Sequence, residues 1–340
     1  MGNNNLKLAD KNFGPILEYV KDNLITEINY CNGILWLDHV KKGRYIVENS
    51  GVTGDWINQF VQKLSSKMNA QCDKLHPYLE AESDALRISV ILEDVTNTGY
   101  AISIKKLDSM CKWIYKDIIE NGFCNEQMDA FLSNAVKAHL NIIVCGLPGS
   151  GKTTFMKYLT KYIPSYEKAT IIESNSEIRY SGINPGKDYI ERKINDEMDY
   201  ADAVKLSMKD LSKWLIIDEI KDRNVTELLK SLSTGISCLT SINGNDVRKI
   251  PERIRNMNPI EININDVYEL VDVVVNVKSV VKKNQEIKCY ISQLALLNHD
   301  VDTGENKIIM LYDTDINVEL PPYIKMKFDE AGVSNPLQYH

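Results

Sequence analysis

The octapeptide Gly146-Leu147-Pro148-Gly149-Ser150-Gly151-Lys152-Thr153 is a complete G-x-x-x-x-G-K-[ST] loop. Four apolar residues precede it, Ile142–Cys145, and predict a short buried strand. The apolar spacing in Thr154–Leu159 predicts a helix directly after it. A strand, this loop and a helix, in that order, form the context in which the motif binds the phosphates of a nucleoside triphosphate. We therefore expect an α/β fold with a nucleotide site here.

The residue types of the loop each suit this chemistry. Glycines let the backbone wrap a phosphate, so that N–H groups and the helix N-terminus point at the anion. Lys152 is expected to reach the β- and γ-phosphates, and the Thr153 hydroxyl is expected to ligate Mg²⁺. ATP and Mg²⁺ are therefore the predicted cofactors. The residues of this stretch predicted to bind them are Gly146, Pro148, Gly149, Ser150, Gly151, Lys152, Thr153 and Thr154.

The bulk composition is that of an ordinary soluble protein, with 44% hydrophobic and 26% charged residues in a chain of 340. This length is enough for two domains. The formal charge of −7 argues against a dedicated nucleic-acid-binding surface. Seven cysteines without a C-x-x-C pair argue against structural zinc and favour a reducing cytosol. No run approaches the roughly 20 apolar residues that span a bilayer, so we expect a cytoplasmic protein.

Two domains are expected along the chain. Residues 1–108 combine helical spacing at 13–20 and 56–68 with strand-like runs at 33–37, 44–47, 86–92 and 100–104, which predicts a small α+β domain. A linker helix region is expected at 109–125. It contains most of a helix predicted over 107–120 and ends where a second predicted helix, 125–140, begins. From 126 to 340 strands and helices alternate, which predicts a parallel sheet covered on both faces.

Polar side chains end three of the strands expected after the phosphate loop. Glu173 ends one, the pair Asp218 and Glu219 ends the next, and Asn243 ends the third. Glu219 is expected to activate the attacking water, Asp218 to support Mg²⁺ through water, and Glu173 to orient water or metal. Asn243 is expected to sense the γ-phosphate. A purely structural alternative stays open, because many α/β strands end in an acid and strand-end amides often only cap turns.

Taken together, these features resemble the traffic ATPases of type II and type IV secretion, conjugation and pilus assembly. In the N-terminal half, Leu24–Asn29, Asp84–Ile88 and Ser103–Leu107 resemble three family segments, the last of which reaches back to the nucleotide. In the C-terminal half, further segments resemble the acidic box, the second nucleotide motif and the histidine box. These are Ile172–Ile178, Ile217–Asp222 and Thr234–Asn245, and Arg253 falls on a recurring family arginine.

The resemblance implies a RecA-like motor domain behind the α+β domain. It also implies a homohexameric ring, with nucleotide bound between the two domains and with Lys105 and Arg253 among the residues that bind it. Inner-membrane components of a secretion or pilus apparatus are the implied partners. Membrane association is then peripheral, at the inner face of the cell membrane and only through those partners. Direct, sequence-specific binding of nucleic acid is not expected.

The chain departs from the family pattern at several positions. The histidine box has Ile236 and Asn243 where histidines are usual. Serine replaces an aspartate of the acidic box at Ser174, and Asp218 replaces a glycine. Lysines replace arginines at three positions: Lys105, Lys209 and Lys221. Because an ammonium group lacks the planar, bidentate geometry of a guanidinium, an arginine-finger role does not transfer directly to these lysines.

We therefore predict an ATP hydrolase that powers a secretion, conjugation or pilus-assembly machine, with the type IV secretion branch favoured. One alternative is a weakly hydrolytic, nucleotide-gated scaffold of the same apparatus, suggested by the missing histidines and the lysines. A second is an unrelated AAA-type ATPase, suggested by Asp218, Glu219 and Asn243. That alternative requires a helical lid after the core, whereas the sequence pattern predicts strands at 271–277 and 286–296.

Overall fold

The computed structural model describes residues 8–39, 42–83, 85–106, 114–222, 224–282, 287–312 and 320–339. The chain divides into two compact units. The first comprises Met1–Met110 with Val280–Ile287, and the second comprises Cys111–Ser279 with Lys288–His340. The domain boundary expected at 108/109 and the aspartate of the segment expected at 84–88 lie outside the described residues.

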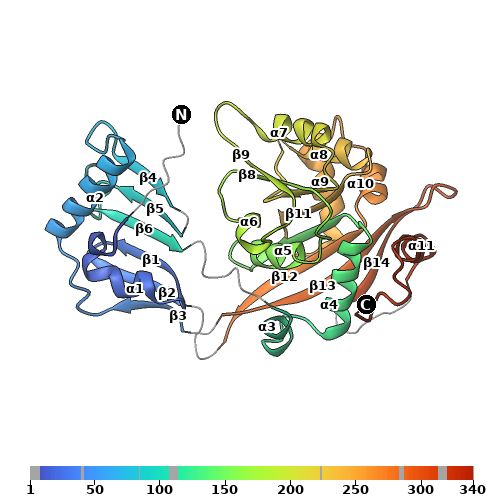
Figure 1. The fold of residues 1–340 in the computed structure, drawn as a ribbon, viewed down its shortest axis with the longest axis horizontal. Coiled ribbons are helices and arrows are strands. Elements are labelled where there is room, and N and C mark those ends of the chain that lie inside the picture. The colour runs from blue at the N-terminus through green and yellow to red at the C-terminus, as the bar shows by residue number, and fades with distance from the viewer. Residues whose placement is uncertain are drawn as a thin grey trace. The chain divides into compact units, whose positions relative to one another are not determined.

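The N-terminal unit is a six-stranded antiparallel sheet in the order β3-β2-β1-β6-β5-β4 (Figure 1). Its strands are β1 (Ile25–Cys31), β2 (Ile34–His39), β3 (Gly43–Val47), β4 (Tyr78–Glu82), β5 (Leu86–Ile91) and β6 (Ala101–Lys106). Its α-helices are α1 (Leu17–Lys21) and α2 (Gly54–Met68), and its short 3-10 turns are Asp10–Asn12, Gly14–Ile16 and Glu93–Val95. This arrangement confirms the predicted α+β class.

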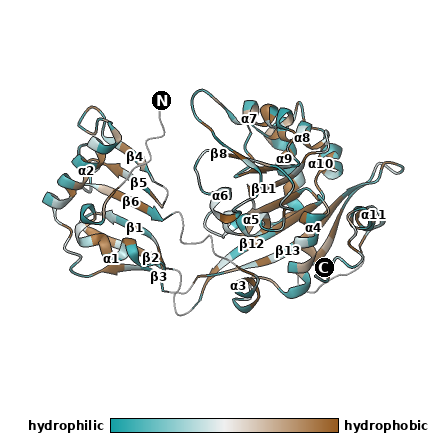
Figure 2. Ribbon diagram, in the orientation of Figure 1, coloured by the Kyte–Doolittle hydropathy of each residue, from teal (hydrophilic) through white to brown (hydrophobic). Residues whose placement is uncertain are grey.

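Helix α2 covers one face of this sheet. Thr53 caps its N-terminus by accepting a hydrogen bond from the Trp56 N–H, and Asn69 ends it in the left-handed conformation. The helix carries both hydrophobic and hydrophilic residues (Figure 2). Its apolar side chains pack against those of the strands in one hydrophobic core. The helix expected at 13–20 is shorter, because Gly14 has a φ of +45° and Pro15 follows it, so that the α-helix begins only at Leu17.

The second unit contains an eight-stranded sheet in the order β14-β13-β12-β7-β11-β10-β8-β9. Its strands are β7 (Ile142–Gly146), β8 (Ala169–Glu173), β9 (Tyr189–Lys193), β10 (Trp214–Ile217), β11 (Ser237–Asn243), β12 (Val273–Val281), β13 (Ile287–His299) and β14 (Asn306–Tyr312). Strands β7 to β12 pair in parallel. The chain thus has the predicted parallel sheet, with the strand of the phosphate loop near its centre.

Helices cover both faces of this sheet. They are α3 (Tyr115–Glu120), α4 (Glu126–Lys137), α5 (Lys152–Thr160), α6 (Tyr180–Ile183), α7 (Tyr200–Ser207), α8 (Val225–Leu232), α9 (Ile250–Met257), α10 (Ile264–Leu270) and α11 (Pro322–Glu330). Residues of β7 alternate between two cores. Ile142 and Val144 pack with α4 and α5, whereas Ile143 and Cys145 pack with α7 to α10. Both faces of the central strand are therefore buried.

The edge formed by β13 and β14 is antiparallel, which the expectation of a wholly parallel sheet did not include. The connection between the two strands spans only 300–305, too short for the crossover that a parallel pair needs. The strands expected at 271–277 and 286–296 correspond to β12 and β13. The helical lid required by the AAA-type alternative is not found there. Of the helix expected at 107–120, residues 107–113 lie outside the described residues.

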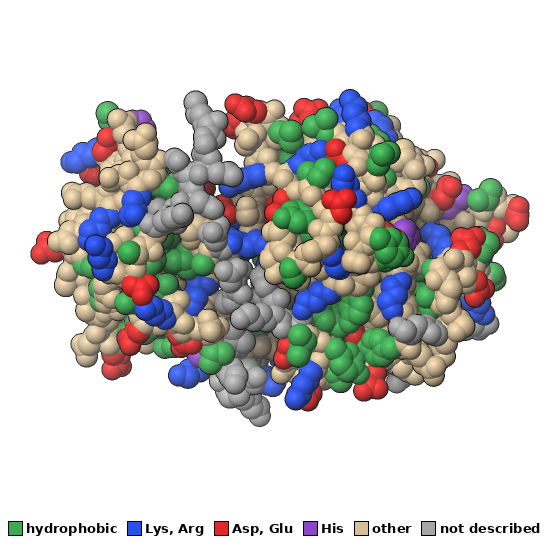
Figure 3. All heavy atoms as spheres, viewed as in Figure 1, with side chains coloured by type: hydrophobic (Ala, Val, Ile, Leu, Met, Phe, Trp, Pro, Cys, Tyr) green, Lys and Arg blue, Asp and Glu red, His purple; other side chains and the backbone are tan. Residues whose placement is uncertain are grey.

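Charged side chains are mixed in sign on the face drawn in Figure 3, where Lys and Arg lie among Asp and Glu over both units. This distribution agrees with the modest negative formal charge of −7. On the face drawn, the mixed signs leave no broad patch of one sign of the kind that steers a polyanion to a protein.

Candidate functional site

The phosphate loop joins β7 to α5, as predicted. Gly151 caps α5 with a φ of +96° and provides no side chain, so the N–H groups of the first helical turn have no side-chain acceptor. At Gly146 a Cβ atom would lie against the Ser150 hydroxyl and 2.5 Å from the Val277 carbonyl oxygen. The loop is therefore shaped by its glycines to present free backbone donors to an anion.

Two hydroxyl groups in the loop lack partners among the described residues. Ser150 is 2% exposed, and its Oγ makes no hydrogen bond. Thr153, in the first turn of α5, has no side-chain hydrogen bond within the part of the chain that the structure describes. Thr154 is buried beside it, whereas Pro148 and Gly149 lie on the exposed side of the loop. A buried hydroxyl without a hydrogen-bond partner destabilises the fold unless a ligand provides that partner. The loop therefore suits a bound phosphate group.

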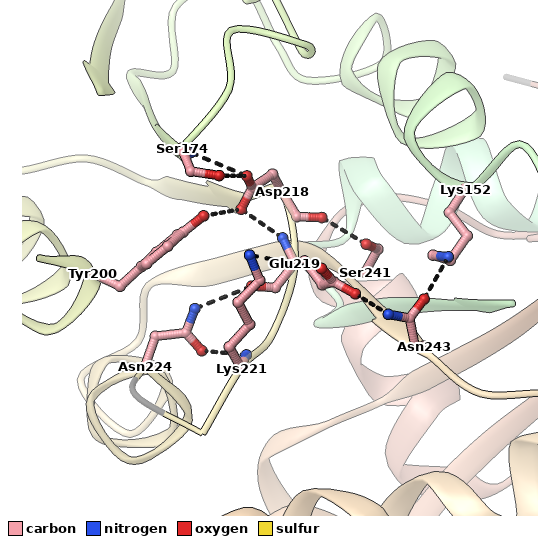
Figure 4. A network of polar contacts seen from close by, with 9 residues as sticks. All are labelled: Lys152, Ser174, Tyr200, Asp218, Glu219, Lys221, Asn224, Ser241 and Asn243. Carbon is pink, nitrogen blue, oxygen red and sulfur yellow. Dashed lines mark hydrogen bonds and ion pairs between the residues drawn. The ribbon is translucent and has the colours of Figure 1, made fainter. Parts of the chain in front are cut away.

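Lys152, Asn243 and Glu219 form a continuous chain of polar contacts (Figure 4). The Lys152 Nζ donates to Asn243 Oδ1 at 3.0 Å, to the Gly146 carbonyl at 3.0 Å and to the Leu147 carbonyl at 3.2 Å. The Asn243 Nδ2 donates in turn to the Glu219 carboxylate. Burial lowers the pKa of Lys152, and the charge of Glu219 opposes that shift. The structure thus brings three of the predicted residues together.

The register of the sheet explains this convergence. Asn243 of β11 is paired with Gly146 of β7, so the amide at the end of one strand lies beside the first residue of the phosphate loop. Glu219 follows β10, the neighbour of β11 on its other side. Carboxyl ends of parallel strands meet at one edge of the sheet, where α/β proteins bind ligands.

The backbone that carries Glu219 is held on both sides. Ser241 Oγ donates to the Asp218 carbonyl at 2.6 Å, and Asn224 Nδ2 donates to the Glu219 carbonyl at 3.0 Å. The Lys221 ammonium lies 3.8 Å from the Glu219 carboxylate. Asn224 was not predicted as a site residue, and no motif signals it. Tertiary packing alone places the start of α8 against this turn.

Glu173 ends β8 as predicted, but its carboxylate holds its own loop. It is 4% exposed and accepts a hydrogen bond from the Ile178 N–H at 2.8 Å. Burial raises the pKa of Glu173 from 4.5 to about 7, and the backbone donors and nearby carboxylates modify that shift. Among the described residues, no contact joins this carboxylate to Lys152 or Glu219.

Three further predicted residues lie outside the phosphate loop. The Asp218 carboxylate contacts Ser174 and Tyr200 and no residue of the phosphate loop. Arg253 lies on α9 and lines an open hollow of about 610 Å³ with other charged side chains. Lys105 lies on β6 of the N-terminal unit, opposite Glu27 and Arg87 in register. Asp218 therefore meets the Lys152–Glu219 chain through the Glu219 backbone N–H, which donates to its carboxylate at 2.7 Å, and not through the phosphate loop.

A family model described as Type II/IV secretion system protein matches residues 72–304, which is more than half of the chain. The chain belongs to the type II/IV secretion system protein family. The matched range begins before β4 and ends after β13, so it includes the phosphate loop and all three strand ends.

The curated relatives of this chain are distant in sequence. An uncharacterized protein of Bacillus anthracis is 22% identical over 249 residues, which cover 73% of this chain and 56% of that protein. The conjugal transfer protein TrbB of Rhizobium radiobacter is 23% identical over 235 residues, covering 67% of this chain and 70% of the relative. The chain thus spans little more than half the length of the first of these relatives.

The ATPase DotB of Yersinia pseudotuberculosis has a similar structure, with a TM-score of 0.65 and 13% identity. The match covers 89% of this chain and 82% of DotB. This likeness confirms the predicted fold class, a RecA-like phosphate-loop domain preceded by a smaller α+β domain. Within the described residues, no helix of this secretion-family chain is both long and apolar enough to cross a bilayer.

Proposed function

We propose that this chain is an ATP-hydrolysing motor of a conjugation or type IV secretion machine. The observation that carries the proposal is the contact chain from Lys152 through Asn243 to Glu219 at the mouth of a phosphate loop. It links the group suited to bind phosphate oxygens with the carboxylate suited to activate water. Two names support the same function: one relative is named a conjugal transfer protein, and one structural neighbour is named an ATPase.

The proposed reaction needs few groups from the protein. ATP phosphates would occupy the free N–H groups at the start of α5, with Lys152 leaving its carbonyl partners for phosphate oxygens. Glu219 would accept a proton from the attacking water as the bond between the γ-phosphorus and its bridging oxygen breaks, giving ADP and phosphate. Asn243 would keep the carboxylate oriented toward that water.

The site also fits a magnesium ion. Thr153 has an unpaired hydroxyl in the first helical turn, and no cluster of three or more acidic, histidine or cysteine ligands exists among the described residues. This donor set suits an ion held chiefly by the nucleotide's phosphates, with Thr153 as its ligand from the protein. Bound there, Mg²⁺ would neutralise charge on the phosphates.

The assembly belongs to the proposal as well. We expect a homohexamer at the inner face of the cell membrane, in contact with inner-membrane components of the apparatus. We propose that the division between domains falls near 108/109, with 109–125 as linker, and that Lys105 and Arg253 serve the nucleotide site within the ring. Glu173, which binds its own loop, would position that loop beside the site.

A second candidate function is a nucleotide-gated scaffold with little turnover. The observation that favours it is that Glu219 is already engaged by Asn243 and by Lys221. These two donors already occupy lone pairs of the carboxylate, which leaves fewer of them to accept from an attacking water.

Hydrolysis measured on size-fractionated protein separates the two functions. The motor requires turnover in the hexameric fraction, abolished in both Lys152→Ala and Glu219→Gln. Lys152→Ala should also lose nucleotide binding, whereas Glu219→Gln should retain it. If the wild type binds ATP and assembles but turns over no faster than Glu219→Gln, the scaffold is the correct function.

A further inference from the structure

The Asp218 carboxylate is surrounded by hydrogen-bond donors from the protein itself (Figure 4). Its Oδ1 accepts from the Tyr200 hydroxyl at 2.7 Å and from the Glu219 N–H at 2.7 Å. Its Oδ2 accepts from the N–H of Ser174 at 3.1 Å and from the Ser174 hydroxyl at 3.3 Å. A carboxylate has about four lone-pair sites, so these four donors engage it fully.

The donors come from three separate segments. Ser174 follows directly after β8, Tyr200 begins α7, and Glu219 is the next residue along the chain. Tyr200 is 7% exposed, so its hydroxyl needs a partner inside the protein. The ammonium of Lys221 lies 5.6 Å from the centre of the Tyr200 ring. Asp218 is thus the point at which the end of β8, the start of α7 and the Glu219 turn meet.

We propose that Asp218 is a positioning residue that fixes the Glu219 backbone against β8 and α7, and that it does not serve the metal. A metal-bound water would have to displace a donor from an already engaged carboxylate. In Figure 4 the Asp218 carboxylate and the Lys152 ammonium lie on opposite sides of Glu219. Through Ser174 and Asp218, the loop that follows Glu173 is therefore tied to the backbone of Glu219, the proposed base.

The contact itself does not depend on what the site hydrolyses. Only the consequence for turnover rests on the proposed function. A test of the contact can therefore be made on protein without nucleotide or magnesium, where a metal-binding role would have no effect on stability.

The first experiment is a double-mutant cycle between Asp218→Asn and Tyr200→Phe, read as the thermal midpoint of metal-free, nucleotide-free protein. Tyr200→Phe removes one charge-assisted hydrogen bond and should lower the midpoint of the wild type by about 4 °C. In the Asp218→Asn background the same change should lower it by about 1 °C or less, because the acceptor is already altered. Asp222→Asn, an exposed carboxylate of the same loop, is the matched control and should leave the midpoint unchanged.

The second experiment titrates magnesium. Asp218→Asn should reduce kcat about tenfold, while the Mg²⁺ concentration for half-maximal hydrolysis stays within about twofold of the wild type. A rise of that concentration by about tenfold, with additive midpoints in the cycle, would identify Asp218 as a metal residue and overturn the proposal.

A substitute variant and a readout that does not depend on hydrolysis keep the experiments decisive. If Asp218→Asn does not fold, Ser174→Ala replaces it in the cycle, because that change removes one donor and keeps the carboxylate. If the wild type does not hydrolyse ATP, the proposed motor fails, but the metal-free cycle still decides whether Asp218 holds Tyr200.

Discussion

The Lys152 ammonium lies 3.0 Å from the Asn243 Oδ1, although the two residues are 91 positions apart in the sequence. The same amide donates from its other side to Glu219. A primary amide can accept from an ammonium and donate to a carboxylate at once, and it does so without titrating near neutral pH. Asn243 is thus the physical link between the phosphate loop and the proposed base.

Removing this amide should slow turnover more than it weakens binding. Asn243→Ala is expected to lower kcat of ATP hydrolysis about 10–100-fold, because Glu219 loses the donor that orients it, with KM within about threefold. Asn245→Ala, exposed two residues further on, is the control. Steady-state kinetics of both variants check this, and an unchanged kcat in Asn243→Ala would refute the linking role.

Asn243→His should introduce a new pH dependence. A neutral imidazole can accept from Lys152, but a protonated one cannot, and the unperturbed pKa of histidine is about 6.5. The ratio of variant to wild-type kcat should therefore rise between pH 6 and pH 8. A flat ratio over that range would mean that the side chain at 243 does not accept from the lysine during turnover.

A side chain at position 146 should disrupt the phosphate loop. A Cβ there would lie 2.5 Å from the Val277 carbonyl oxygen, a backbone atom that cannot yield locally. Gly146→Ala is expected to cost about 1–3 kcal/mol of unfolding free energy and to weaken nucleotide binding at least tenfold. Gly182→Ala is the matched control, because its Cβ would meet nothing within 4 Å. Denaturant titration and equilibrium nucleotide binding test both expectations, and equal effects of the two changes would contradict them.

Glu173 should make stability fall as the pH rises. Burial raises its pKa from 4.5 to about 7, so between these values the folded chain binds a proton that the unfolded chain has lost. Unfolding free energy should therefore drop by up to about 3 kcal/mol from pH 4.5 to pH 8 through this group, and Glu173→Gln should remove that contribution.

Urea titrations of the wild type and Glu173→Gln across this pH range measure the difference, with the exposed Glu261→Gln as control. A difference between wild type and Glu173→Gln that does not change with pH would show that the pKa of the carboxyl is the same in the folded and unfolded chains, against the expected rise.

Lys187 should stabilise the far end of the phosphate-loop helix. Its ammonium donates to the carbonyls of Thr160, Lys161 and Ile163 at 3.0, 2.8 and 2.7 Å, at the C-terminus of α5. These carbonyls lie at or past the end of the helix, where the Ile163 N–H donates to the Thr160 carbonyl at 3.3 Å, and a cation favours the negative end of the helix dipole.

Lys187→Met should therefore cost about 2–4 kcal/mol of unfolding free energy in denaturant titrations. The exposed Lys205→Met, on α7, should cost less than about 0.5 kcal/mol. Similar losses in the two variants would show that the three hydrogen bonds at Lys187 contribute nothing beyond a general charge effect.

The sequence alone determined the features that depend on neighbouring residues. The phosphate loop between strand and helix was predicted correctly, because glycine spacing, a preceding apolar run and the helical pattern after it are all local. The same holds for β8 and β10, whose continuous apolar runs signal strands buried on both faces. Strands β1, β4, β9 and β14 were not predicted as strands. Strands β4, β9 and β14 lie at sheet edges, and β4 and β9 carry glutamates among their few apolar residues, so the pattern of burial is weak.

Only the tertiary structure decided which polar groups meet. The sequence placed Asp218 and Glu219 together at one strand end, but the fold turns them to different partners, Asp218 to Tyr200 and Glu219 to Asn243. Consecutive side chains of extended backbone point to opposite sides, and sheet register and helix packing determine what lies on each side. The pairing of Asn243 with Gly146, set by the order of strands across the sheet, is the clearest case, because no local pattern records it.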